Sequence, residues 1–157
     1  MVKRYLNITI AILICLLVGF LSSLAVVDAI QEWYVDLNKP FFTPPNELFS
    51  PVWTLLYIMM GISVGIVWNR GFHHIWVKTA LYHFLFQLLL NGLWSLVFFG
   101  LHSIVGGLLI ILTLFILLLF TYKWFKVVDS RAAYLLIPYI IWVAYATVLN
   151  IGIWNLN

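Results

Sequence analysis

Residues 103–122 read SIVGGLLIILTLFILLLFTY, twenty residues in which no side chain carries a charge. An α-helix rises about 1.5 Å per residue, so about 20 residues cross the roughly 30 Å hydrocarbon core of a bilayer. Five apolar runs of this length fill the chain, at about 5–27, 47–69, 78–100, 103–123 and 132–154. We therefore predict an all-α integral membrane protein, with residues 1–157 forming a single domain of five transmembrane helices.

The charged residues are few and unevenly placed. Hydrophobic residues make up 65% of the chain and charged residues 8%, against about a quarter charged in an ordinary soluble domain. Basic side chains collect before the first run, around the second loop and around the fourth loop, and only one lies on the other side: Lys3, Arg4, Arg70, Lys78, Lys123, Lys126 and Arg131 against Lys39. This asymmetry predicts a cytoplasmic N-terminus, and it explains the net charge of +3 without a nucleic-acid partner.

The first run admits a second interpretation. Lys3 and Arg4 precede an apolar stretch that ends in Ser22-Ser23-Leu24-Ala25, as in a cleaved signal peptide. The apolar stretch is longer than the 7–15 residues of a signal sequence, so we expect a retained span.

Residues 28–46 form the one long loop, on the side opposite the basic loops. Three prolines prevent a continuous helix, although residues 33–36 could form a helical turn. Aromatic residues gain by burial, which argues against disorder, so we predict a structured external lid. The lid residues singled out are Trp33, Tyr34, Lys39, Pro40, Phe42, Pro44 and Pro45.

Local signals mark details of the second and fifth runs. Ser50 and Pro51 suit the start of a helix, but Asn46 and Glu47 suit a start one turn earlier. Pro138 is expected to bend the fifth span.

Small residues recur in the second run at Gly61-x-x-x-Gly65. This spacing allows two helices to approach closely, either within the chain or at a dimer seam.

Aromatic and polar residues recur at steps of three and four on three runs, so each set lies on one helix face. Amides directed into lipid would be costly, so these faces are expected to point into the bundle. Trp53, Trp94 and Ala146 are expected about 9–12 Å below the outer surface, beneath the lid, where the three sets could wall a ligand pocket or simply pack together. They are Trp53, Tyr57, Met60 and Val64; Gln87, Asn91, Trp94 or Ser95, and Phe98; and Tyr139, Trp142, Ala146 and Asn150.

Several chemistries lack their expected residues. No run carries a central Asp, Glu, Lys or Arg, as an ion-coupled pump would require. No HExxH, Walker loop or metal-ligand cluster is present, so we assign no metal and no hydrolytic site. The single Cys15 can form no internal disulfide.

Four ordered segments resemble the translocator protein or tryptophan-rich sensory protein family (TspO/MBR), formerly the peripheral benzodiazepine receptor. They cover residues 33–150 with the span count and loop lengths of that family. They are Trp33-Tyr34-x-x-Leu37-x-Lys39-Pro40-x-Phe42-Thr43-Pro44-Pro45, Pro51-Val52-Trp53-x-x-Leu56-Tyr57-x-x-Met60-Gly61, Gln87-x-x-x-Asn91-x-x-Trp94-Ser95-x-x-Phe98-Phe99-Gly100 and Pro138-Tyr139-x-x-Trp142-x-x-Tyr145-Ala146-Thr147-x-Leu149-Asn150.

The resemblance implies a five-helix bundle, commonly a homodimer, whose pocket under the first loop binds tetrapyrroles such as protoporphyrin IX and haem. No cofactor is required, and the porphyrin is the ligand. Residues that match the family's pocket are Trp53, Tyr57, Asn91, Trp94, Ser95, Trp142 and Ala146. We expect a receptor or sensor, with Phe98, Tyr139 and Asn150 as further contacts.

Two alternatives remain within this resemblance. One is a porphyrin transporter or exporter. The other is light-dependent porphyrin degradation, for which Trp33, Tyr34 and Trp142 match the aromatic positions of bacterial relatives. The sterol-associated Tyr and Arg of animal members are missing after Val148, which favours a bacterial plasma membrane and no steroid role. Phe42 stands where the family more often has Trp, which retains stacking but lacks the indole.

Overall fold

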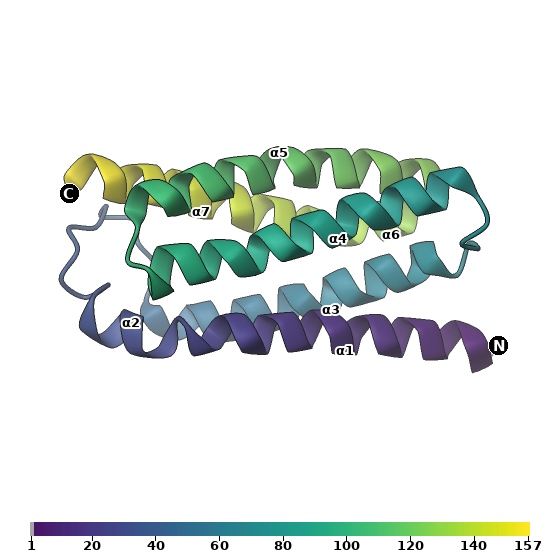
Figure 1. The fold of residues 1–157 in the computed structure, drawn as a ribbon, viewed down its shortest axis with the longest axis horizontal. Helices are drawn as coiled ribbons and strands as arrows, with labels where there is room; N and C mark the ends of the chain where they lie inside the picture. The colour runs from purple at the N-terminus through teal and green to yellow at the C-terminus, as the bar shows by residue number, and fades with distance from the viewer. Residues whose placement is uncertain (1) are drawn as a thin grey trace.

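The computed structural model describes residues 2–157 and consists of helices joined by short connections and by one longer loop, residues 33–45 (Figure 1). Five helices are long and apolar enough to cross a membrane, which confirms the predicted fold class. They are α1 (Val2–Leu24), α3 (Phe49–Trp68), α4 (Ile75–Ser95), α5 (Ile104–Val128) and α7 (Ile137–Leu156).

Four short elements extend or connect these helices. The 3₁₀ turn η1 (Asn46–Leu48) leads into α3, and the π-helical turn η2 (Leu96–Gly100) continues α4. Two short α-helices, α2 (Val27–Glu32) and α6 (Ser130–Leu135), follow α1 and precede α7.

The observed boundaries correct several expectations. The first span lies at residues 2–24 rather than 5–27, and α2 occupies the start of the predicted lid loop 28–46, because residues 27–32 contain no proline and bury Ala29. The fourth span continues five residues beyond 123, since Lys123 and Lys126 stay on exposed helix faces.

The structure also shows where α3 begins and how the chain behaves near Pro138. Helix α3 is preceded directly by η1, so the earlier start at Asn46 is correct, and Ser50 lies inside the helix. The fifth span is interrupted at Leu136, two residues before Pro138, which confirms a distortion at this proline.

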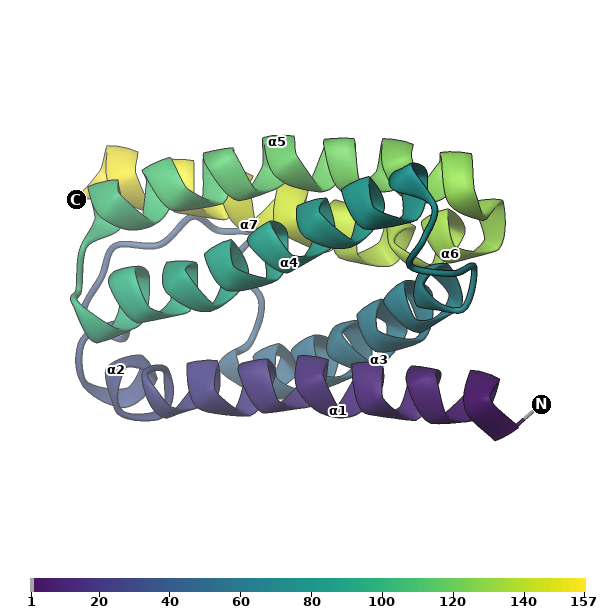
Figure 2. The ribbon, with the colours of Figure 1, turned by 45° about the vertical axis from the view of Figure 1, so that its right-hand side comes forward.

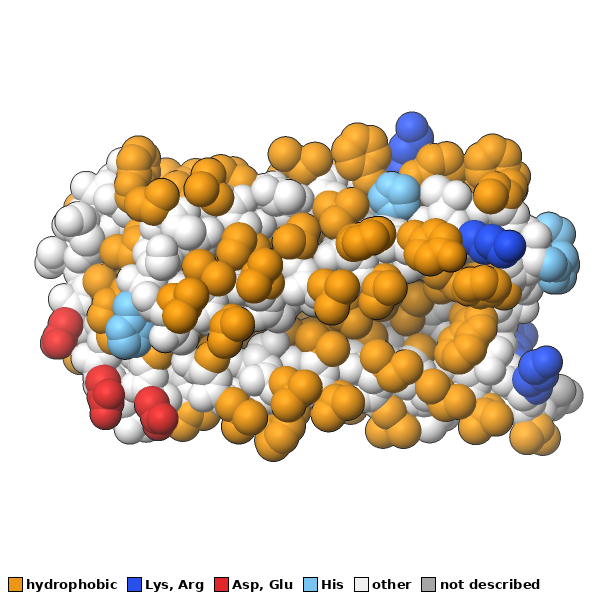
Figure 3. Space-filling view, viewed as in Figure 1, with side chains coloured by type: hydrophobic (Ala, Val, Ile, Leu, Met, Phe, Trp, Pro, Cys, Tyr) orange, Lys and Arg blue, Asp and Glu red, His pale blue; other side chains and the backbone are white. Residues whose placement is uncertain are grey.

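The helices pack as a closed bundle. Helix α1 lies along α3, α4 lies along α5, and α5 lies along α7, while α1 also contacts α4 (Figures 1 and 2). The apolar side chains left on the outside cover the middle of the face seen in Figure 3, as a bilayer-spanning protein requires.

Glycines allow the close contact between α1 and α3. Gly61 and Gly65 are buried against the backbone of Ile12 and Ile8. A Cβ atom at residue 65 would lie 2.7 Å from Cα of Ile8, so only glycine fits there without displacement of the helices. The Gly61-x-x-x-Gly65 pattern therefore serves an intramolecular contact.

We predict that Gly65→Ala lowers the free energy of unfolding by about 1–3 kcal/mol, because the added methyl group must push α1 away. Thermal unfolding of the detergent-solubilised protein measures the change. Gly92→Ala is the matched control: it also faces α1, but its Cβ would lie 3.4 Å from Ser22 Oγ and would fit. Equal stability of the Gly65→Ala variant and the parent protein would refute this role.

Charge is segregated between the two ends of the bundle. On the face shown in Figure 3, Lys and Arg lie toward the end of the bundle that holds the N-terminus, which we call the basic end. Asp and Glu lie at the opposite end, which we call the lid end. The separation agrees with the orientation predicted from the sequence.

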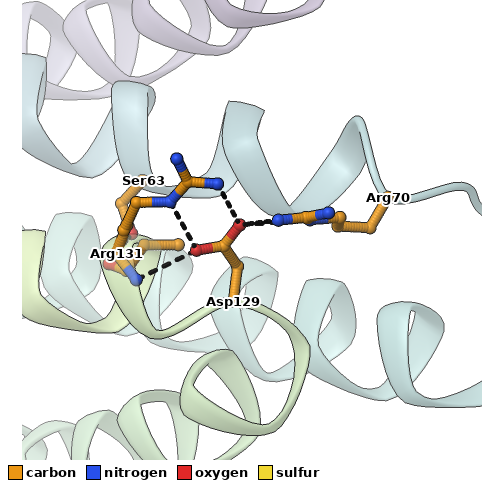
Figure 4. Close-up of polar contacts among 5 residues, drawn as sticks. Ser63, Arg70, Asp129 and Arg131 are labelled. Carbon is orange, nitrogen blue, oxygen red and sulfur yellow. Dashed lines mark hydrogen bonds and ion pairs between the residues drawn. The ribbon is translucent and has the colours of Figure 1, made fainter.

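An aspartate fastens the helices at the basic end. Asp129 lies between Arg70, after α3, and Arg131, in α6 (Figure 4). Arg70 Nε donates to Asp129 Oδ2 at 3.1 Å, and the backbone N–H of Arg131 donates to Oδ1 at 2.9 Å. Nearby, Ser63 Oγ donates to the carbonyl oxygen of Ala132 at 2.6 Å. These bonds tie the end of α3 to the start of α6.

The pKa of Asp129 reflects this arrangement. Burial opposes its charge, but the hydrogen bonds from Arg70 and Arg131 outweigh burial and lower the pKa from 3.8 to about 2. A depressed pKa stabilises the fold above the unfolded value of 3.8, and this contribution is lost as the pH falls through about 2.

We predict that Asp129→Asn costs about 2 kcal/mol of stability at neutral pH, and that the difference from the parent protein shrinks as pH falls from about 4 to 2. Unfolding curves in acid-stable detergent across this range measure both. A stability difference that does not change with pH would contradict the assignment.

Candidate ligand site

A cavity of about 620 Å³ opens at the lid end, between α1, α2, the first two turns of α3 and the end of α4. Its volume lies within the roughly 300–1,000 Å³ of small-molecule sites. The lining residues are Leu16, Gly19, Phe20, Ser22, Ser23, Val26, Val27, Ile30, Gln31, Asn46, Phe49, Ser50, Trp53, Thr54, Tyr57, Trp94, Ser95 and Phe99.

Three aromatic rings form one wall of the cavity. The ring centroid of Trp53 lies 5.8 Å from that of Tyr57 and 6.2 Å from that of Trp94, both at tilted angles. The indole Nε1 of Trp94 is buried and has no hydrogen-bond acceptor among the described residues. Buried Trp N–H groups usually have a partner, so this unpaired donor is an exception within the cavity wall.

The polar part of the lining is uncharged. It consists of hydroxyl and amide side chains from α1, α2, η1, α3 and α4: Ser22, Ser23, Gln31, Asn46, Ser50, Thr54, Tyr57 and Ser95. No Asp, Glu, Lys, Arg or His is among the lining residues of this cavity. Such a site recognises shape and hydrogen-bonding groups and offers no ion pair.

A chain of hydrogen bonds lies behind the aromatic wall. Tyr57 Oη donates to Asn91 Oδ1 at 2.9 Å, and Asn91 Nδ2 donates to Tyr139 Oη at 2.6 Å. Tyr139 Oη in turn donates to Gln87 Oε1 at 2.8 Å. All four side chains are buried, so Asn91 and Tyr139 support the cavity wall from behind and do not line the cavity.

Three predicted contact residues on α7 also lie away from the cavity. Trp142 packs edge-on against Trp53, with ring centroids 6.4 Å apart, and against Phe49 at 6.2 Å. Ala146 and Asn150 are buried further along α7, and Asn150 Oδ1 has no donor among the described residues. The structure thus brings Trp53, Tyr57, Trp94 and Ser95 together around the cavity and leaves the α7 residues outside it.

The π-helical turn η2 directs two consecutive phenylalanines inward. The backbone N–H of Leu101 donates to the carbonyl oxygen of Leu96, five residues back, at 2.9 Å. Phe99 lines the cavity, whereas Phe98 stacks on Trp94 at 5.8 Å. Turns of this kind often occur at functional sites.

The lid is held by its own lysine. Lys39 Nζ donates to the carbonyl oxygens of Tyr34, Val35 and Leu37, at 2.6, 3.1 and 3.2 Å, and lies 4.8 Å from the centre of the Tyr34 ring. These bonds close residues 34–39 into a compact turn after α2.

The far part of the lid rests on α7. Tyr145 Oη donates to the carbonyl oxygen of Phe42 at 2.5 Å, and Pro40 packs directly on Gly152. Asn38 N donates to Asn157 Oδ1 at 3.0 Å, and Asn157 Nδ2 donates back to the Asn38 carbonyl at 2.9 Å. Pro44 and Pro45 then lead into η1, and the chain returns to α3 (Figure 2).

Trp33 and Tyr34 of the lid are packed beside the cavity, whereas Phe41 is fully exposed. Trp33 stacks on His102 with centroids 4.7 Å apart, and its ring edge meets Phe98 at 5.4 Å. Tyr34 is buried, and burial, with a smaller contribution from Tyr145, raises the pKa of its phenol to about 12. Tyr34 therefore stays neutral at physiological pH.

Comparison with known proteins now adds to this geometry. The family model for the TspO/MBR family matches residues 11–155. The chain belongs to the TspO/MBR family. It is 42% identical to "Tryptophan-rich protein TspO" of Archaeoglobus fulgidus over 97% of each chain. It is 34% identical to "Tryptophan-rich sensory protein" of Cereibacter sphaeroides over 81% of this chain and 78% of that protein, and 36% identical to "Translocator protein" of Sus scrofa over 88% and 83%.

The TspO/MBR assignment confirms the resemblance drawn from the four motif segments, and with the five spans it makes the chain a multi-pass membrane protein. Sequence reasoning nevertheless missed the contribution of α1 and α2 to the cavity. A signal was present, because Gly19, Ser22 and Ser23 interrupt an otherwise bulky apolar span. Helix α1 packs against α3 and α4 and is long and apolar enough to cross a membrane.

We predict that Lys39→Met loosens the lid of this TspO/MBR protein, because three carbonyl acceptors lose a charged donor. Hydrogen bonds to charged groups contribute about 1.5–3 kcal/mol, so amide hydrogen exchange in residues 33–44 should accelerate about tenfold or more. Lys126→Met, on the exposed face of α5, is the control and should leave the lid unchanged. Unaltered exchange in the Lys39→Met protein would show that docking on α7 alone holds the lid.

Proposed function

We propose that this protein is a membrane receptor or sensor that binds a tetrapyrrole, such as protoporphyrin IX or haem, in the cavity beneath the lid. The observation that carries the proposal is the aromatic wall of Trp53, Tyr57 and Trp94 around a cavity of about 620 Å³. The relatives named for a sensory role and for translocation support a receptor function in the membrane.

The chemistry of the wall suits a flat apolar macrocycle. Indole and phenol rings stack on extended π-systems, and Trp53, Tyr57 and Trp94 supply three such rings. The propionate groups of the ligand would meet the amide group of Asn46 and the hydroxyl group of Ser50 at the polar lining. Lys39 is not free for this task, because it is bonded within the lid.

The proposal is for binding without turnover. Trp33, Tyr34 and Trp142, the candidates for light-dependent chemistry, do not line the cavity. No charged residue lines it either, which disfavours ion-coupled transport through this site. No His, Cys or Met is among the residues that line the cavity, so haem would be held by its ring and side groups.

We further propose residence in a bacterial plasma membrane as a homodimer. A 40% identical relative from the bacterium Chlorobaculum tepidum supports the location. Because Gly61 and Gly65 contact α1 of the same chain, pairing of two copies would use a different helix face.

Titration of the purified protein in detergent with protoporphyrin IX, in the dark, tests the site through tryptophan fluorescence. We predict saturable quenching, with an affinity about tenfold weaker in Trp94→Leu, because the stacking surface is lost. Trp154→Leu, at the exposed end of α7, is the control and should bind as the parent does. Linear quenching that ignores Trp94→Leu would indicate partition into the micelle and would refute the site.

A further inference from the structure

A second, smaller cleft lies at the basic end, remote from the ligand cavity. Its volume is about 190 Å³. The start of α1, the end of α3 with the residues after it, and the α5–α6 junction form it together. The lining residues are Arg4, Ile66, Asn69, Arg70, Asp129 and Arg131.

The lining is strongly basic. Three arginines face one aspartate, which leaves two net positive charges. The Asp129 side chain is 3% exposed, whereas those of Arg70 and Arg131 are 49% and 72% exposed. The carboxylate is therefore the buried partner, and the two guanidinium groups converge on it from opposite sides (Figure 4).

The carboxylate uses only part of the donor capacity of these arginines. Arg70 and Arg131 each direct Nε and one terminal nitrogen to Asp129. Each guanidinium has five N–H donors, so terminal donors remain on both. The guanidinium of Arg4 has no acceptor among the described residues, although the Arg4 carbonyl oxygen accepts from Asn69 Nδ2 at 3.0 Å.

Asn69 holds the two sides of the cleft together. Its Oδ1 accepts from Asn7 Nδ2 at 2.9 Å, while its Nδ2 donates to the Arg4 carbonyl. The first turns of α1 are thus fixed against the end of α3. Arg4 is placed beside Arg70 and Arg131 by this contact, and the three charges do not simply lie on separate mobile loops.

We infer that this cleft binds the phosphate group of an anionic phospholipid. Planar guanidinium groups suit phosphate oxygens, and a basic pocket between transmembrane helices at the cytoplasmic side is suited to acidic lipid headgroups. The cleft lies where the helices end, at the level of the headgroups, so a lipid can present its phosphate without leaving the bilayer.

Native mass spectrometry of the full-length protein in detergent tests this inference. Dihexanoyl phosphatidylglycerol is titrated and the first lipid adduct is followed, with dihexanoyl phosphatidylcholine as the zwitterionic comparison. The phosphatidylglycerol adduct should form at lower lipid concentration than the phosphatidylcholine adduct. Arg4→Gln should lower the affinity for phosphatidylglycerol by about tenfold or more, whereas the loss of one surface charge near an anionic lipid lowers affinity by only about fivefold.

Lys126→Gln is the matched control, because it removes one positive charge from the same end of the protein outside the cleft. It should weaken the adduct by less than fivefold. Arg4→Gln removes no side-chain bond of the described residues, so its thermal stability should equal that of the parent and confirm that it is folded. Arg4→Lys should recover part of the affinity, since it keeps the charge and loses the planar donor pair.

Three results would overturn the inference. Equal adduct formation by the two lipids would show that the cleft does not recognise the headgroup charge. Equal losses in Arg4→Gln and Lys126→Gln would show diffuse attraction in place of a site. Glycerol phosphate is titrated in the same way, and an Arg4-dependent glycerol phosphate adduct that forms at the same concentration as the phosphatidylglycerol adduct would assign the cleft to a soluble phosphate compound.

Discussion

The hydrogen-bond chain from Tyr57 through Asn91 and Tyr139 to Gln87 determines how three helices of the bundle meet. Hydrocarbon offers no water to these groups, so hydrogen bonds within the protein stabilise them, and only the Nε2 amide of Gln87 in this chain of bonds lacks an acceptor among the described residues. The chain joins α3, α4 and α7 at one level. It also fixes Tyr57, whose ring forms part of the cavity wall. The position of the cavity wall therefore depends on hydrogen bonds to Asn91, Tyr139 and Gln87, which do not themselves line the cavity.

The sequence predicted the membrane class and the inward faces of α3, α4 and α7, because length, charge and a period of 3.6 residues are local properties. It did not predict which inward residues surround empty space. In such a pattern Asn91 and Tyr139 cannot be distinguished from Trp53 and Trp94. Asn91 and Tyr139 are nevertheless hydrogen-bonded to each other, and this pairing is visible only in the three-dimensional structure. Helix α1 was missed because it contributes small side chains, Gly19, Ser22 and Ser23, and has no aromatic stripe.

The two cavities divide the recognition chemistry of the molecule. The larger one, at the lid end, is aromatic and hydroxylic and contains no charge. The smaller one, at the basic end, is built around three arginines and an aspartate. Because charge is costly in hydrocarbon and favourable at the headgroups, this division follows from depth in the bilayer. Lys39 is consistent with this dependence on depth, because its ammonium group donates to lid carbonyl oxygens and does not line the cavity.

The π-helical turn η2 places a restriction on how the family member can change in evolution. The extra residue in this turn allows Phe98 and Phe99 to be buried together and leads within three residues to Ser103, which caps α5. Each residue of a helix turns the chain by about 100°, so loss or gain of one residue between 96 and 103 would rotate α5 relative to α4. We therefore expect a change in the length of this segment to disturb the bundle more than a substitution at the exposed Leu96 or Leu101.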